Sequence, residues 1–329
     1  MQAQTIAGLT VTADDLAPKG FAWPEPVAVI DLDIAPQHGE APDLPPWPVI
    51  GIGNPAHPLA ARLDTLVEPG FDAVQLVLAV RAQPKAAATL IQLLRLLPSL
   101  SVADGLVAES LAYATLQASE AHRTWIAVRE SGTPTPPGRV VLTREDDRAM
   151  AMLDRAEAGN AIDRPMRDAL HEAFALVNLD PTISSITLRG AGRTFSLGAD
   201  LAEFGTTRDP AMAHAIRMRT LPALEAARCG ERFVAEIDGA CVGSGLELAA
   251  FAGRITATAR SWFQLPELAM GIIPGAGGCV SLTRRIGRQR TALMVLSGRR
   301  IPARKALEWG LIDAIVDQPS ARDGGDDAG

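Results

Sequence analysis

The chain has 329 residues, of which 47% are hydrophobic and 21% are charged, and its formal net charge is −7. This balance is typical of a soluble globular protein with one large domain or two smaller ones. The negative charge argues against general affinity for nucleic acid or an anionic membrane, and no apolar stretch is long enough to span a bilayer.

Two strands are predicted near the amino terminus. Residues 27–33 and 49–52 are rich in valine and isoleucine, and they follow an irregular lead-in over residues 1–26. Gly51 and Gly53 lie at the end of the second strand. They favour a strand-to-helix turn over a nucleotide-binding loop, which would need a third spaced glycine.

Helices are predicted to fill the chain from His57 to Arg129. Leucines recur at helical spacing before Pro98, which ends one helix, and Ser101 is a good cap for the next. The proline-rich residues 133–138 then form the clearest linker in the chain. We therefore expect an N-terminal part over residues 1–138.

Beyond the linker, strands alternate with helices. Strands are predicted at residues 140–142, 149–153, 183–188, 233–237 and 254–258, and helices at 165–178, at 245–252 and from about 277. Such alternation is typical of an α/β layer structure. We expect a core over residues 139–317 and a disordered polar tail over residues 318–329.

Cysteine and histidine usage predicts neither a disulfide framework nor a metal site. Cys229, Cys241 and Cys279 lack metal-ligand spacing and are odd in number, which favours a reducing, cytoplasmic compartment. The five histidines form no ligand cluster, and His214 is interpreted as a helix-surface residue. The amino terminus lacks a basic start followed by an apolar run, so we expect no signal peptide.

Two glutamates stand in apolar surroundings within the core. Glu247 follows an apolar strand and a glycine turn, and Glu267 precedes the turn Pro274–Gly278. A buried, unpaired carboxylate is costly unless it takes up a proton. Taken singly, each glutamate could be an ordinary acid, on a helix face or in a loop. Two of them in neighbouring segments favour an acid/base pair.

Four sequence blocks of the core occur in a recognisable order. They are RTFSLGADL at residues 193–201, GSGLELA at 243–249, LPE with GIIPGAGG between 265 and 278, and WGLID at 309–313. In composition and order, the blocks resemble the enoyl-CoA hydratase/isomerase (crotonase) family over residues 139–317. The resemblance implies a crotonase-like α/β fold with a ββα spiral core, preceded here by a helical N-terminal part.

The resemblance also implies the site residues. In the family a thioester forms an enolate, whose oxygen is held by backbone N–H groups at a turn and at a helix amino terminus. The donors here would be the N–H groups of Ala199 and Ser244, while Glu247 activates water and Glu267 delivers a proton. The same blocks imply substrate contacts from Gly198, Asp200, Leu201 and Gly243.

Two implied positions leave alternatives open. Ser244 stands where the family usually has glycine. It is interpreted as a backbone donor, although its hydroxyl could act as a nucleophile if a base activated it. Arg155 matches the segment that lines the CoA entrance, where arginine suits phosphate. It could equally be a solvated surface arginine.

Residues 81–128 resemble helices that family members carry after the last block. The likeness rests on RAQPKAAATL at residues 81–90 and SVADGLVAES at residues 101–110. We therefore hypothesise a circular permutation that moves these helices in front of the core. The alternative is an unrelated helical domain. Permutation requires helices 84–97 and 101–118 to lie near helix 290–297 and Trp309.

The predicted activity is hydration of a 2-enoyl-CoA. The spacing of 20 residues between the glutamates is typical of hydratases in the family, which need no metal or redox cofactor and meet coenzyme A as part of the substrate. One alternative is another reaction through the same oxyanion hole, such as double-bond isomerisation or carbon–carbon bond cleavage. A second alternative is a non-catalytic acyl-CoA-binding protein. It is considered because Ser244 and Gly253 differ from the residues that relatives usually carry at these positions. The resemblance implies a homotrimer or a hexamer.

Overall fold

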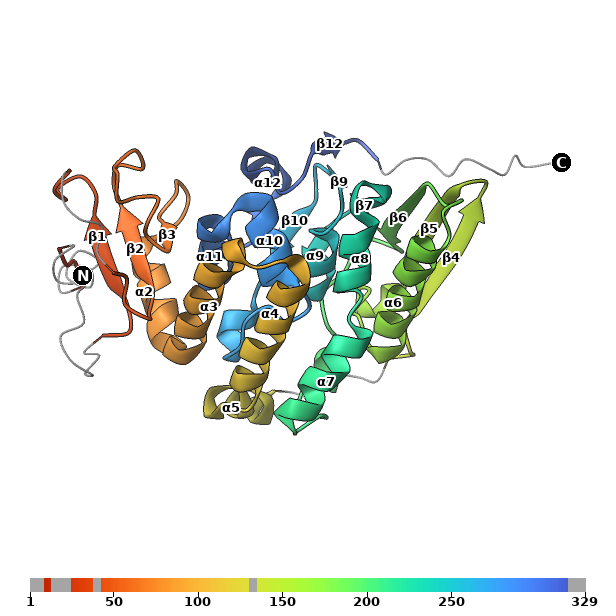
Figure 1. Cartoon of the computed structure of the whole chain (residues 1–329), viewed down its shortest axis with the longest axis horizontal. Coiled ribbons are helices and arrows are strands. Elements are labelled where there is room, and N and C mark those ends of the chain that lie inside the picture. The colour runs from red at the N-terminus through yellow and green to blue at the C-terminus, as the bar shows by residue number, and fades with distance from the viewer. Residues whose placement is uncertain (1–8, 13–24, 38–42, 130–134, 319–329) are drawn as a thin grey trace.

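The computed structural model describes residues 9–12, 25–37, 43–129 and 135–318. The predicted lead-in lies largely outside these ranges, as do residues 133–134 of the predicted linker and the tail from residue 319. The described chain is a mixed α/β structure with three sheets (Figure 1). Within these ranges, no helix combines the length and the apolarity needed to cross a membrane.

A small parallel sheet lies at the N-terminal end of the described chain. Its strands are β1 (Ala28–Asp31), β2 (Val49–Ile52) and β3 (Thr65–Leu66), in that order, so both predicted strands are confirmed. The predicted helical start at His57 is wrong. Residues 57–64 form turns, because their apolar side chains pack on this sheet instead of forming a helix face.

Four helices follow this sheet: α2 (Ala73–Ala82), α3 (Pro84–Leu96), α4 (Val102–Gln117) and α5 (Glu120–Val128). The predicted stop and cap are confirmed. Helix α3 ends before Pro98, and Ser101 Oγ accepts the N–H of Asp104 at 3.1 Å where α4 begins.

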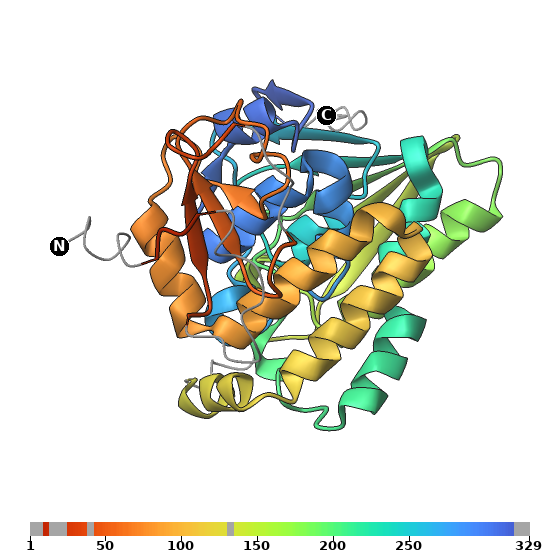
Figure 2. The same ribbon diagram turned by 60° about the vertical axis from the view of Figure 1, so that its left-hand side comes forward.

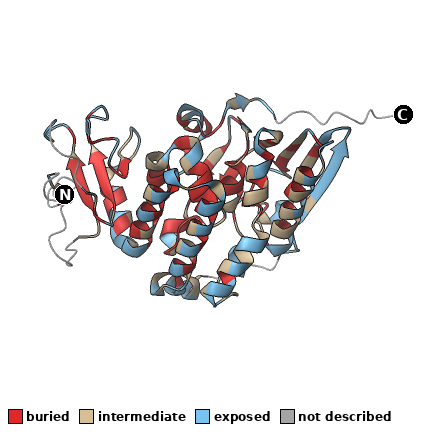
Figure 3. Ribbon diagram, viewed as in Figure 1, coloured by how far each residue is buried: buried red, intermediate tan, exposed pale blue. Residues whose placement is uncertain are grey.

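The largest sheet has six strands in the order β12-β9-β7-β6-β5-β4. Only its first two strands in sequence pair antiparallel, and the remaining neighbours are parallel. The strand β4 forms an edge that is mostly exposed (Figure 3). The strands are β4 (Arg139–Glu145), β5 (Arg148–Asp154), β6 (Ser185–Gly190), β7 (Phe233–Ile237), β9 (Arg254–Thr258) and β12 (Ala314–Val316).

A second three-stranded sheet carries the segments around the glutamates. Its order is β11-β10-β8, from β8 (Ala240–Val242), β10 (Trp262–Gln264) and β11 (Ile301–Pro302). Because β8 and β10 run parallel, the residues that follow them, with Glu247 and Glu267, emerge at the same edge.

Helices cover these sheets at the positions expected from the alternating pattern. The amphipathic helix predicted at residues 165–178 is confirmed as α6, which buries Met166, Leu170, Phe174 and Val177 at helical spacing. The helices of this region are α6 (Arg164–Leu179), α7 (Pro210–Thr220), α8 (Ala223–Cys229), α9 (Ser244–Ala249), α10 (Gly278–Ile286), α11 (Arg288–Ser297) and α12 (Ala303–Trp309).

The N-terminal helices pack directly on the core. Helices α3 and α4 lie on α10 and α3 also lies on α11, while α4 runs along α7 (Figure 2). They share one hydrophobic cluster with the large sheet. Phe71, just before α2, stacks on Trp309 with ring centroids 5.8 Å apart. The contact of α3 with α11 meets part of what the permutation hypothesis requires, whereas α4 contacts α10 and the residue stacked on Trp309 precedes both helices. The permutation itself stays a prediction.

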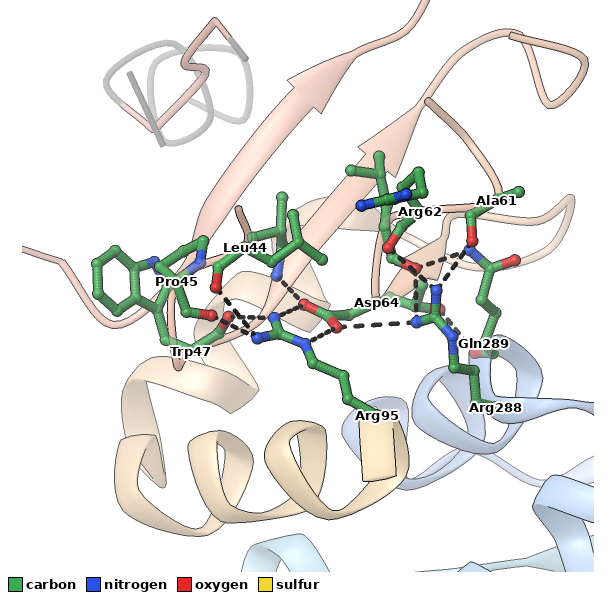
Figure 4. A network of polar contacts seen from close by, with 12 residues as sticks. Leu44, Pro45, Trp47, Ala61, Arg62, Asp64, Arg95, Arg288 and Gln289 are labelled. Atoms are coloured by element: carbon green, nitrogen blue, oxygen red, sulfur yellow. Dashed lines mark hydrogen bonds and ion pairs between the residues drawn. The ribbon is translucent and has the colours of Figure 1, made fainter. Parts of the chain in front are cut away.

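A buried carboxylate ties the small sheet to two helices (Figure 4). Asp64 accepts both Nε and Nη2 of Arg95 on α3, at 2.8 and 2.6 Å, and the backbone N–H of Val49 at 2.9 Å. Arg288, at the start of α11, lies 3.9 Å from the same carboxylate and donates to the carbonyl of Leu63 at 2.9 Å. The anchor therefore joins the small sheet to α3 within the N-terminal part, and Arg288 connects it to α11 of the core.

Candidate active site

A cavity of about 620 Å³ lies between the N-terminal helices and the core. Both glutamates line it, as do the two predicted amide donors and the residues beside them. The predicted residues in its wall are Gly198, Ala199, Asp200, Leu201, Gly243, Ser244, Glu247 and Glu267. The structure thus brings together every predicted site residue except Arg155.

The Glu247 carboxylate is buried and held by backbone. Its side chain leaves the first turn of α9, and Oε2 accepts the N–H groups of Ala276 and Gly278 at 2.7 and 2.9 Å. Burial raises the pKa of Glu247 to about 7, although these N–H donors favour the ionised form. Glu247 is therefore poised to exchange a proton near neutral pH.

The Glu267 carboxylate is also buried, but fewer hydrogen bonds hold it than hold that of Glu247. It begins the short 3-10 turn Glu267–Met270 after Pro266, and its Oε2 makes no hydrogen bond to any described residue. Burial, and then the charge of Glu247, raise the pKa of Glu267 well above its ordinary value. One acid of the pair can therefore be ionised while the other keeps its proton, the combination that acid/base chemistry needs.

Two residues whose backbone N–H groups have no acceptor in the described chain line the cavity beside the acids. Gly198 has a φ of +95°, and a Cβ there would lie 3.1 Å from the carbonyl oxygen of Val242, so the two turns touch. Ser244 is the first residue of α9, where N–H groups have no partner inside the helix. Within the described chain, neither the N–H of Ala199 nor that of Ser244 donates to an acceptor. Two free donors at touching turns can hold an oxyanion.

The Ser244 hydroxyl is buried and makes no hydrogen bond to a described residue. No base among these residues therefore activates it, as a nucleophile would require. The geometry supports the interpretation of Ser244 as a backbone donor over that of a nucleophile.

Arg155 lies outside the cavity wall and is buried, with a relative exposure of 4%. It pairs with Asp200 at 2.8 Å and with Asp163 at 3.5 Å, and it donates to the carbonyls of Pro136 and Ala161. Its guanidinium is therefore engaged by the protein. The structure supports neither the phosphate contact nor the solvated surface arginine expected from the sequence. Instead Arg155 braces Asp200, whose carboxylate also accepts the N–H of Ala202.

The sequence analysis missed Glu109 on α4. It is 1% exposed, and its carboxylate accepts the N–H groups of Gly277, Cys279 and Val280 at 2.6, 2.8 and 3.3 Å. Glu247 holds residues 276 and 278, so the two carboxylates alternate along one glycine-rich segment. Burial and the charge of Glu247 raise the pKa of Glu109 to about 8. The available signal was its place three residues after Leu106 on the buried face of the helix.

Three residues of α4 and α5 that line the cavity were also missed: Tyr113, Gln117 and His122. Tyr113 packs against Gly275, where an added Cβ would lie 2.2 Å from the ring. The Nδ1 of His122 lies 2.8 Å from the carbonyl oxygen of Met270, and burial lowers the pKa of this imidazole. The N-terminal part therefore supplies one wall of the cavity.

Comparison with known proteins finds enoyl-CoA hydratase/isomerase relatives by sequence and by structure. The sequence profile described as enoyl-CoA hydratase/isomerase matches residues 147–322. The mevalonyl-coenzyme A hydratase SIDH of Beauveria bassiana is 35% identical over 176 residues, covering 50% of this chain and 61% of that protein. The 2,3-dehydroadipyl-CoA hydratase of Escherichia coli is 31% identical, covering 54% of this chain and 68% of its own. An enoyl-CoA hydratase/isomerase structure from Mycobacterium paratuberculosis has a TM-score of 0.51 at 26% identity, over 57% of this chain and 76% of its own.

The match therefore covers part of each protein. The chain spans 61% and 68% of the length of these two curated relatives. The matched residues 147–322 include both cavity glutamates and both free N–H groups. Tyr113, Gln117 and His122 precede residue 147, so the wall formed by α4 and α5 lies outside the region that the family profile matches.

Proposed function

The chain belongs to the enoyl-CoA hydratase/isomerase family, and we propose that it adds water across the 2,3 double bond of an enoyl-CoA thioester. The crotonase-like α/β fold and a reaction on acyl-CoA thioesters follow from the family. The observation that carries the finer proposal is that two buried carboxylates with raised pKa values line one cavity with two free backbone N–H groups.

In the proposed reaction the thioester oxygen accepts hydrogen bonds from the N–H groups of Ala199 and Ser244. These donors stabilise the negative charge that forms on this oxygen when water attacks C3. Glu247 takes a proton from the water, and Glu267 gives its proton to C2. Glu247 has then gained a proton and Glu267 has lost one. Transfer of one proton from Glu247 to Glu267 restores the starting state of both acids. This chemistry uses no metal or redox cofactor.

A hydration assay with matched variants tests this proposal. The purified protein is expected to consume 2-enoyl-CoA thioesters and to form the 3-hydroxyacyl products, measured by loss of enoyl absorbance and by mass. Glu247→Gln and Glu267→Gln each replace an acid with an amide of the same shape. We expect both variants to lose most of the hydration rate, by about 10² to 10⁴.

The same assay separates hydration from double-bond isomerisation. An isomerase that relies on Glu267 alone would keep much of its turnover in Glu247→Gln, whereas a hydratase would not. Acyl-CoA binding without turnover of any enoyl-CoA would point to a non-catalytic binding protein. We also propose that the protein assembles as a homotrimer or a hexamer, which light scattering of the purified chain tests.

A further inference from the structure

An arginine without an acidic partner lies in the cavity wall. Arg217 on α7 places its guanidinium over the ring of Tyr113, 4.7 Å from the ring centroid. Its Nε donates to Ser110 Oγ at 2.9 Å, Nη1 to Gln117 Oε1 at 3.2 Å and Nη2 to the carbonyl oxygen of Ser110 at 3.1 Å. The guanidinium is therefore held in one orientation by α4.

Arg217 has no ion-pair partner among the described residues. Two other arginines of the described chain have a carboxylate by comparison: Arg95 pairs with Asp64, and Arg155 pairs with Asp200. The groups that it contacts are neutral, although the charge of Glu109 acts on the Arg217 guanidinium without a direct contact. A half-buried cation of this kind is costly unless a ligand supplies the counter-charge.

The hydrogen-bonding capacity of Arg217 is also incomplete. A guanidinium has five N–H groups, and three of them donate to Ser110 and Gln117. One N–H remains on each terminal nitrogen. Such a pair matches the two oxygens of a carboxylate, which arginine binds with two parallel hydrogen bonds.

The ring of Tyr113 connects this arginine to the reacting end of the cavity. One edge of the ring lies against Gly275, the neighbour of Ala276, which holds Glu247. One face of the ring carries Arg217. The phenol also lies close enough to Glu247 and Glu267 for their charges to act on it. Tyr113 therefore lies between Arg217 and the segment whose backbone binds Glu247.

We propose that the acyl group of the substrate ends in a carboxylate bound by Arg217, so that the substrate class is the CoA monothioester of a 2-unsaturated dicarboxylic acid. This inference rests on the proposed function, because it assumes that the acids mark the position of the double bond. Tyr113 and Gln117 orient the guanidinium, and Arg217 selects the acyl end.

Matched pairs of substrates test the proposal. Each 2-enedioyl-CoA of five to eight carbons is compared with the neutral 2-enoyl-CoA of equal length, and kcat/KM is measured for both. A charge-assisted contact predicts a preference of about 10- to 100-fold for the dicarboxylic thioester at the best chain length. Arg217→Met should abolish the preference, while Arg217→Lys should keep part of it. Arg228→Met removes an exposed arginine of α8 that lies outside the cavity wall, and it should retain the preference.

Binding measurements separate this inference from the proposed function. The saturated dicarboxylic and neutral acyl-CoA pairs are titrated into the wild type and into Arg217→Met by calorimetry, which needs no turnover. Tighter binding of the dicarboxylic member in the wild type alone supports the inference, even if hydration is never observed. Equal affinities for both members, or a preference that persists in Arg217→Met, would overturn it, even if hydration is fast.

Discussion

Replacing Glu109 with Gln should change how the stability of the protein depends on pH. The amide has the shape of the protonated acid but does not titrate. Burial and the charge of Glu247 raise the pKa of Glu109 from 4.5 to about 8 in the folded protein. The stability that comes from this raised pKa is fully present below pH 4.5 and is lost as the pH rises through about 8. The wild type therefore loses stability over a window in which the variant does not.

The size of the effect follows from the shift. One pKa unit corresponds to about 1.36 kcal/mol, so between pH 5 and pH 8 the wild type should lose roughly 3 kcal/mol more than Glu109→Gln. Urea unfolding at pH 5, 6, 7 and 8 measures the difference directly. Leu106→Ala, on the same buried face of α4, removes no titrating group and should give a constant difference at every pH. A constant difference for Glu109→Gln as well would refute the raised pKa.

Substitutions at three further positions probe the site and the buried anchor. Ser244→Ala keeps the backbone N–H and should retain activity, whereas Ser244→Pro, tolerated at a first helical position, removes it and should lower kcat by about 10² to 10³ in the hydration assay. Gly278→Ala places a Cβ 2.4 Å from Cγ of Glu247, so kcat/KM should fall by about 10² through displacement of the carboxylate, with an unchanged circular dichroism spectrum. Asp64→Asn breaks the buried anchor to Arg95 and should cost about 3–5 kcal/mol in urea unfolding; a loss below 1 kcal/mol would mean that the anchor behaves as a surface ion pair.

The parts of the fold that follow local rules were predictable from the sequence. Alternation of strands and helices after residue 139 predicted the α/β core, and Ser101 and Pro98 marked the helix boundaries that the structure has. The stretch from His57 to Asp72 was not predictable in this way. Its apolar residues have a helix-like spacing, but they pack as turns on a sheet whose third strand has only two residues.

In the candidate site, too, the residues that lie in short motifs were predictable, and those that depend on distant contacts were not. Glu247 and Glu267 were found because each lies in a short motif, and the parallel pairing of β8 with β10 then brings them to one edge. Glu109 was missed because the N–H groups it binds lie 168 to 171 residues away along the chain. Arg155 was misread for a related reason, since its carboxylate partner Asp200 is 45 residues away. No local pattern encodes contacts of that range.

Acetoacetyl-CoA provides the most direct measurement of how strongly backbone N–H groups stabilise a thioester oxygen. Its enolate has its own ultraviolet absorbance. If the N–H groups of Ala199 and Ser244 stabilise that oxygen, the bound ligand should ionise at a lower pH than free acetoacetyl-CoA. The enolate band should then grow on binding to the wild type and be absent with Ser244→Pro. A bound ligand that ionises at the same pH as the free thioester would contradict the account.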